Sequence, residues 1–182
     1  KEPERLRKYG EIVRNLVNHL LRQVEQVLET GSPAGSRKAI RKVPVRLREF
    51  LEEICAQMEP RIICAQGTLE LTYGSTREWV EADPLHLTNI LFNLLDNSIK
   101  YSGDHPVVRV NVYDQGKKIR VQVADNGPGI PPKHRKRVFE RFYRIPAGNN
   151  QVPGGFGLGL YYTWHAARAH GWSVQIGEAP GR

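Results

Sequence analysis

One predicted helix, residues 83–101, constrains the fold more than any other segment of the sequence. Asp83-Pro84 begins it with a capping side chain followed by proline at the first helical position, and Ser102-Gly103 ends it. Most of its surface is apolar and has to be buried against other elements, through Ile90, Leu91, Leu94, Leu95 and Ile99. The helix therefore predicts a packed core around it.

The same helix carries polar side chains along one face. They recur every three or four residues, at Asn89, Asn93, Asn97 and Lys100. Asparagine is a mediocre helix former and costs free energy when it is buried without partners. Two interpretations are open: this face is a solvent-exposed edge, or it faces a ligand, with amide oxygens for a metal ion and Lys100 for phosphate.

The other segments mix strands and helices. Strands are predicted at 43–46, 69–73, 79–80, 107–113, 119–124 and 172–176. Helices are predicted at 47–59, where Pro60 ends the helix, on a short basic segment around 133–137, and from the glycine-rich stretch up to His170. Because hairpin strands are mixed with helices that can all lie on one face, the sequence predicts an α/β (α+β) two-layer sandwich with a mixed sheet, rather than a doubly wound sheet.

The first 30 residues predict a separate helical element. Residues 5–29 carry two adjacent apolar stripes at helical spacing, one starting at Leu6 and the other at Ile12. Two seams on one helix are typical of a four-helix bundle, so we expect a partner helix and a second subunit. Gly, Ser and Pro residues then indicate a linker. The expected domains are 1–30, 31–42 and 43–182.

Composition excludes several classes of protein. The net charge of +8 would suit nucleic acid, but the basic residues are scattered and no DNA- or RNA-binding signature accompanies them, so we expect no nucleic-acid partner. Cys55 and Cys64 fit neither a zinc site nor a disulfide framework; they favour a reducing compartment and core or half-buried positions. No apolar run approaches the roughly 18 residues that span a bilayer. Since the chain begins at Lys1 rather than Met, we expect a longer parent protein.

Two glycine-containing segments indicate ligand contacts, although each is a weak signal by itself. Residues 125–130, Asp-Asn-Gly-Pro-Gly-Ile, directly follow a predicted strand. Their glycines permit close approach of a planar ligand, and the Asp can accept a hydrogen bond from an exocyclic amine. Residues 154–160, Gly-Gly-Phe-Gly-Leu-Gly-Leu, open the last long helix, where free N–H groups and the helix dipole favour phosphate. The spacing matches neither a Walker A sequence nor a Rossmann fingerprint.

Four motifs occur together in one order. They are 93–101 (Asn-Leu-Leu-Asp-Asn-Ser-Ile-Lys-Tyr), 125–130, 139–144 (Phe-Glu-Arg-Phe-Tyr-Arg) and 155–160. They resemble, in turn, the asparagine box, first glycine box, phenylalanine box and second glycine box of sensor histidine kinases, a branch of the GHKL superfamily with gyrase, heat-shock chaperone and mismatch-repair ATPases. The resemblance runs from about Val43 to the end of the chain. It implies a Bergerat-type ATP-binding fold for 43–182, and for 1–30 the second helix of an incomplete dimerisation and phosphotransfer bundle.

The resemblance implies that the matched residues bind ATP and Mg²⁺. Asn97 would coordinate the magnesium ion with Asn93 assisting, and Lys100 and Arg144 would bind phosphate oxygens. Of these, Asn97, Lys100 and Arg144 would carry catalysis. Residues 144–154 would form a mobile lid over the nucleotide.

The same resemblance implies contacts to the base and to the pocket walls. Asp125 would accept a hydrogen bond from the adenine amine, and Gly129 would let the base come close. Tyr101 and Tyr143 would line the pocket, and backbone amides at Gly157 and Gly159 would reach the phosphates. Further nucleotide contacts are implied for Gly127, Ile130, Val138, Gly155, Leu158 and Leu160.

One position separates phosphotransfer from hydrolysis. In the hydrolysing relatives a glutamate stands four residues before the magnesium asparagine, but here that residue is Asn93, and an amide cannot act as a general base. The resemblance therefore implies transfer of the γ-phosphoryl group to a histidine brought from elsewhere. His19 lacks the acidic residue and the proline pair that follow the family's acceptor, so we expect the acceptor to lie outside the chain. Two alternatives stay open: a nucleotide-binding interaction module without turnover, and a true ATPase, which Asn93 disfavours.

The resemblance also implies partners and a location. It implies a response regulator protein, a homodimer formed through the helical bundle of the parent, and a cytoplasmic domain of a parent anchored in the inner (cytoplasmic) membrane. Two features depart from the family. Phe156 replaces a small hydroxyl residue, and the chain ends at Gly181-Arg182, where relatives continue into one more strand. We therefore expect a sheet that lacks an edge strand.

Overall fold

The computed structural model of the protein describes residues 40–146 and 155–177, which belong to one compact unit, Ala39–Arg182. The predicted bundle helix 1–30 and most of the predicted linker 31–42 lie outside the described residues. No helix in the described ranges is long and apolar enough to cross a membrane. The elements are, in order, β1 (Val43–Arg46), α2 (Leu47–Cys64), β2 (Thr68–Tyr73), β3 (Trp79–Ala82), α3 (Pro84–Tyr101), β4 (Val107–Gln115), β5 (Lys118–Asp125), the 3-10 turns η1 (Pro132–His134) and η2 (Arg137–Phe139), and α4 (Gly159–His170).

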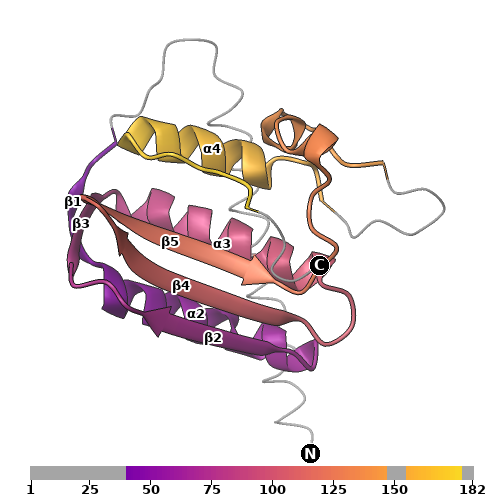
Figure 1. The fold of residues 1–182 in the computed structure, drawn as a ribbon, viewed down its shortest axis with the longest axis horizontal. Helices are drawn as coiled ribbons and strands as arrows, with labels where there is room; N and C mark the ends of the chain where they lie inside the picture. The colour runs from indigo at the N-terminus through magenta and orange to yellow at the C-terminus, as the bar shows by residue number, and fades with distance from the viewer. Residues whose placement is uncertain (1–39, 147–154, 178–182) are drawn as a thin grey trace, which may run out of the picture. The chain divides into compact units, whose positions relative to one another are not determined.

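A three-stranded mixed sheet forms one layer of the fold (Figure 1). Its order is β2-β4-β5, with β2 parallel to β4 and β4 antiparallel to β5. The parallel pair needs a crossover, which runs through β3 and α3, whereas the antiparallel pair is a hairpin. β1 and β3 pair separately as a two-stranded antiparallel sheet. The predicted mixed sheet is confirmed.

The second layer consists of helices. α2 and α3 contact each other on one face of the sheet, and α4 packs against α3 (Figure 1). Alternation along β4 buries Val108, Val110 and Val112 in the shared core and leaves Arg109 and Tyr113 exposed. The helices fill the same core with Leu47, Leu51, Ile54, Met58, Ile62, Leu87, Leu91 and Leu95. The predicted two-layer sandwich is therefore correct.

α3 begins where the sequence predicts. The Asp83 carboxylate accepts hydrogen bonds from the backbone N–H groups of Leu85 and His86, and Pro84 occupies the first turn. Partial burial opposes ionisation of Asp83, but these donors and the backbone N–H of Arg41 outweigh it and lower the pKa of this carboxyl group. The cap therefore fixes where α3 begins.

The predicted end of α2 is wrong. The helix continues through Pro60 to Cys64, instead of ending at Glu59. Proline inside a helix removes one hydrogen bond and usually ends or kinks the helix. Here Met58 and Ile62, on either side of Pro60, are 0% and 3% exposed and hold the last turn against the core. Tertiary packing therefore outweighs the local preference.

The prediction for the cysteines is half wrong. Cys55 is half-buried, and burial, reinforced by the charge of Glu52, raises the pKa of its thiol. Cys64 is exposed, because the extended last turn directs Ile62 to the core and Cys64 away from it. Both thiols are free.

Two further predicted elements differ from the structure. The basic segment around 133–137 forms the two 3-10 turns η1 and η2 instead of one short helix. Residues 172–176 form no strand: their exposure alternates as in a strand, but no described strand pairs with them. Gly171, at φ 80°, ends α4, and the Trp172 N–H donates to Ala167. A strand needs a hydrogen-bonding neighbour, which an alternating pattern alone does not specify.

His170 links the end of α4 to the start of α3. The residue is buried, its Nδ1 lies 2.7 Å from the Ala166 carbonyl oxygen, and its Nε2 lies 2.9 Å from the backbone nitrogen of Asp83. A carbonyl only accepts and an N–H only donates, so the ring is neutral with its proton on Nδ1. A second proton on Nε2 would face the Asp83 N–H, and the hydrogen bond between the helices would be lost.

This geometry predicts acid sensitivity. Burial, together with His86 and Lys42, lowers the pKa of His170 from its ordinary 6.5, against the opposing effects of Ala166 and Asp83. Unfolding therefore takes up a proton as the pH falls below about 6.5, and the free energy of unfolding decreases in that range. We expect His170→Gln, which keeps an acceptor but does not titrate, to lose less stability between pH 7 and pH 5 than the wild type in denaturant titrations.

A control variant at His165 distinguishes its contribution to the pH dependence of stability from that of His170. Partial burial, with Arg168 nearby, also lowers the pKa of His165. His165→Gln should remove only that residue's share of the pH dependence. If His170→Gln retained the whole wild-type slope, the assigned protonation state would be wrong.

Candidate functional site

The amide row of α3 faces α4 over its first turns. Asn89 is 3% exposed, and its Nδ2 donates to the Tyr162 hydroxyl at 3.3 Å, which also lies 2.7 Å from Nδ1 of His86. One turn later, Asn93 lies against Gly159, where an added Cβ would come within 3.3 Å of the Asn93 Oδ1. The row is therefore not a solvent-exposed edge at these two positions. Its next member, Asn97, is half-buried.

Asp125 is held at the end of β5 by both of its oxygens. The Ser98 hydroxyl on α3 donates to Oδ2 at 3.0 Å, and the Gly127 N–H donates to Oδ1 at 2.9 Å. Gly127 also passes so close to α3 that an added Cβ would lie 2.8 Å from the Tyr101 carbonyl oxygen. The first glycine segment is therefore fixed against the C-terminal end of α3, and its carboxylate has one orientation.

The neighbouring loop residues fix the rest of this segment. The side chain of Asn126 accepts a hydrogen bond from the Val107 N–H at 2.8 Å and donates one to the His105 carbonyl oxygen at 3.3 Å. Gly129 is exposed and adopts φ 68°, a conformation that favours glycine. The Ile130 carbonyl accepts from Arg135 Nε at 3.0 Å. A base could thus approach Gly129 without meeting a side chain at that residue.

The second glycine segment contacts the phenylalanine segment. The Phe142 N–H donates to the Gly157 carbonyl oxygen at 3.1 Å, and Gly157 adopts φ 69°. A Cβ at Gly157 would lie 2.8 Å from both the Phe142 carbonyl carbon and the Tyr143 carbonyl oxygen. Tyr143 is held in turn by a 2.6 Å contact with His134 and by the Arg137 guanidinium, 4.3 Å from its ring centre. These contacts bring together segments that are distant in sequence.

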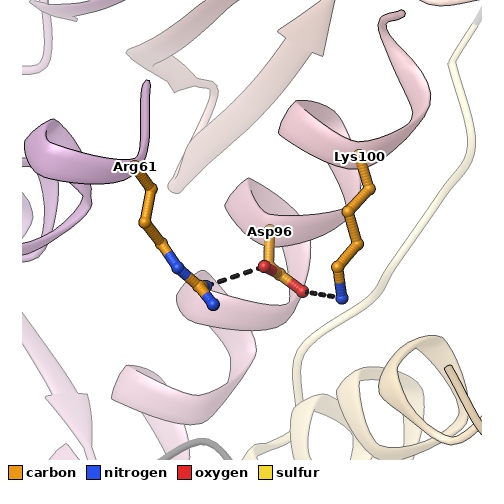
Figure 2. Close-up of polar contacts among 3 residues, drawn as sticks. All are labelled: Arg61, Asp96 and Lys100. Atoms are coloured by element: carbon orange, nitrogen blue, oxygen red, sulfur yellow. Dashed lines mark hydrogen bonds and ion pairs between the residues drawn. The ribbon is translucent and has the colours of Figure 1, made fainter. Parts of the chain in front are cut away.

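Lys100 has a carboxylate partner that sequence reasoning missed. Its Nζ lies 2.5 Å from Oδ2 of Asp96, and Oδ1 of Asp96 lies 2.7 Å from Nη1 of Arg61 on α2 (Figure 2). The spacing of Asp96 and Lys100 along a helix could have predicted their ion pair. Nothing in the sequence pattern predicts Arg61, because it lies beyond the proline expected to end α2.

The remaining predicted site residues differ in exposure. Val138 and Leu158 are buried, and Tyr143, Ile130 and Leu160 are half-buried. Tyr101, Gly155 and Arg144 are exposed. The contacts described above connect the amide helix to both glycine segments, and the second glycine segment to the phenylalanine segment.

The site has chemistry that suits a nucleotide. Gly127, Gly157 and Gly159 let the two glycine segments pack closely against Tyr101, the phenylalanine segment and Asn93, where an added Cβ would be crowded. Asp125 offers an oriented carboxylate to an amine. Within the described residues, no three His, Cys, Asp or Glu side chains gather as a metal site.

Comparisons with known proteins agree with this geometry. The family described as histidine kinase-, DNA gyrase B-, and HSP90-like ATPase matches residues 82–182. The sensor protein RprX of Bacteroides fragilis is 27% identical over 172 residues, which cover 93% of this chain and 33% of RprX. The chain spans between 24% and 46% of the length of curated relatives such as this one.

Solved structures show the same fold. Full-length ShkA in complex with AMPPNP superimposes with a TM-score of 0.67 and 28% identity, over 91% of this chain and 34% of ShkA. The histidine kinase ThkA, in complex with the response regulator protein TrrA, superimposes with a TM-score of 0.60 and 26% identity, over 79% of this chain and 42% of ThkA. The family match extends over more than half of the chain. The chain therefore belongs to the histidine kinase-, DNA gyrase B- and HSP90-like ATPase family and carries the ATP-binding domain of a sensor histidine kinase.

Proposed function

We propose that the chain binds Mg-ATP and presents its γ-phosphoryl group to a histidine outside the chain, as the catalytic module of a two-component kinase. The observation that carries the proposal is the Asp125 carboxylate, oriented by Ser98 and Gly127 beside the amide row of α3. The similarity to ShkA, whose structure is a complex with AMPPNP, supports nucleotide binding by this chain.

Each predicted residue has a role in this proposal. Asp125 accepts from the adenine amine, and Gly129 lets the base approach. Asn97 supplies the protein oxygen for magnesium with help from Asn93, which stands beside Gly159. Lys100 and Arg144 neutralise phosphate charge, and the ion supplies further charge neutralisation when it is bound. The remaining contacts are Tyr101, Gly127, Ile130, Val138, Tyr143, Gly155, Gly157, Leu158, Gly159 and Leu160.

The proposal favours transfer over hydrolysis. Asn93 offers no general base for water near pH 7. The phosphoryl group therefore passes to a histidine on a bundle helix of the parent and then to an aspartate of a response regulator. ThkA, a relative in structure, forms a complex with such a regulator. In the same proposal, 1–30 is the second bundle helix, 31–42 a linker and 43–182 the catalytic domain of a cytoplasmic region, with a homodimeric, membrane-anchored parent.

The test combines binding and transfer. We expect isothermal titration calorimetry to detect AMPPNP binding that strengthens with magnesium. With radiolabelled ATP, the chain alone should not label itself, and an added kinase helix fragment that carries an acceptor histidine should become labelled. Binding without transfer would instead support an interaction module, and phosphate release without an acceptor would support an ATPase. Label on His19 would contradict the proposal.

A further inference from the structure

One carboxylate at the candidate site is shared by two cations. Asp96 binds Arg61 through Oδ1 at 2.7 Å and Lys100 through Oδ2 at 2.5 Å, so each oxygen has its own partner (Figure 2). The Asp96 side chain is only 17% exposed, against 37% for Arg61 and 31% for Lys100. The carboxylate is therefore the shielded centre of the cluster, and both cations reach it from more open positions.

The cluster joins two helices through the unexpected last turn of α2. Arg61 follows Pro60, and the buried Ile62 next to it fixes the direction of this turn. Had α2 ended at Glu59, no helical turn would place a guanidinium beside α3. The side chains of Arg61, Asp96 and Lys100 carry a net charge of +1. This net positive charge can attract a phosphate group, provided that the Asp96 carboxylate keeps a cationic partner.

Lys100 has two competing partners in this arrangement. The proposed function assigns it to a phosphate oxygen, but in the structure it binds Asp96. Moving Lys100 away from Asp96 costs little free energy if another cation stays with the carboxylate. A shielded carboxylate without any cationic partner costs much more free energy. Arg61 is that second cation, and its bond to Asp96 does not involve Lys100.

We infer that the ion pair with Asp96 holds Lys100 away from the triphosphate. Arg61 weakens this restraint, because it binds the same carboxylate and stays bound to it when Lys100 leaves. The inference rests on the proposed function, because it concerns the lysine assigned to phosphate there. Asp96 and Arg61 act through Lys100 and are positioning residues. The restraint applies to phosphate-bearing ligands and not to adenosine.

The inference predicts opposite effects of two substitutions. Asp96→Asn frees Lys100 and should tighten AMPPNP binding, and Arg61→Met leaves Asp96 to Lys100 alone and should weaken it. Each change should be about three- to fivefold, as for a partly exposed ion pair. Arg61→Lys should restore most of the affinity, because it returns the charge. Adenosine affinity should not change in any of these variants.

Double variants distinguish this mechanism from a general effect of charge. If Arg61 acts through Asp96, Arg61→Met should have no effect on AMPPNP affinity in the Asp96→Asn background. If Asp96 acts through Lys100, Asp96→Asn should have no effect in the Lys100→Met background. Persistence of either effect would mean that the residue acts on the phosphates directly, and would overturn the inference.

The outcome can be separated from that of the proposed function. Absence of AMPPNP binding by the wild type would contradict the function itself. Binding by the wild type, with affinity unchanged or weakened by Asp96→Asn, would overturn the restraint alone. Thermal unfolding of each variant shows whether it is folded, and the Arg61 substitutions, at a partly exposed side chain, still test the inference if Asp96→Asn does not fold.

Discussion

Replacing Asp125 by asparagine should weaken AMPPNP binding by about 10- to 100-fold, the value of a hydrogen bond to a charged group. The carboxylate offers acceptors only, and two of its lone pairs are used by Ser98 and Gly127. An asparagine has the same shape, but its NH₂ group replaces one acceptor oxygen. Whichever way the amide turns, it loses the negative charge that favours an exocyclic amine.

The measurement is calorimetry with Mg-AMPPNP, accompanied by thermal unfolding. Asp104→Asn is the matched control, because it makes the same chemical change at an exposed position after α3 and should leave affinity unaltered. Equal affinity of Asp125→Asn and the wild type would remove the base contact from the proposal. A loss of affinity in the control of the same size would point to net charge instead of a specific hydrogen bond.

Gly157→Ala should destabilise the protein more than Gly103→Ala, although both glycines have nearly the same φ angle. Their φ angles are 69° and 73°, so each alanine costs about 1–2 kcal/mol for a left-handed residue. A Cβ at Gly103 meets nothing within 4 Å, whereas at Gly157 it would lie 2.8 Å from backbone atoms of Phe142 and Tyr143. Overpacking adds about 1–3 kcal/mol at Gly157 alone.

Denaturant titration of the two variants measures this difference directly, since the shared backbone term cancels. Gly157→Ala should also weaken AMPPNP binding, because relief of the overlap separates the second glycine segment from the phenylalanine segment. Gly103→Ala should bind as the wild type does. Equal destabilisation of both variants would mean that the two segments are not in contact.

Local sequence determined much of the fold. Asp83-Pro84 specifies the start of α3 because capping and the fixed φ of proline act within one turn. Alternation specifies which side chains of β4 are buried, as Val108, Val110 and Val112 show. The four motifs identified the family, since each depends on residue types at fixed short spacings. The four-residue spacing from Asp96 to Lys100 on one helix is likewise enough to indicate their ion pair.

Long-range packing decided what these patterns left open. The buried Ile62 carries α2 through Pro60, and this exposes Cys64 and brings Arg61 to Asp96. The absence of a pairing partner among the described strands leaves 172–176 without strand structure, despite its alternation. Propensities act between near neighbours and are worth a few kcal/mol at most. Contacts between distant segments outweigh them, and such contacts exist only once the chain has folded.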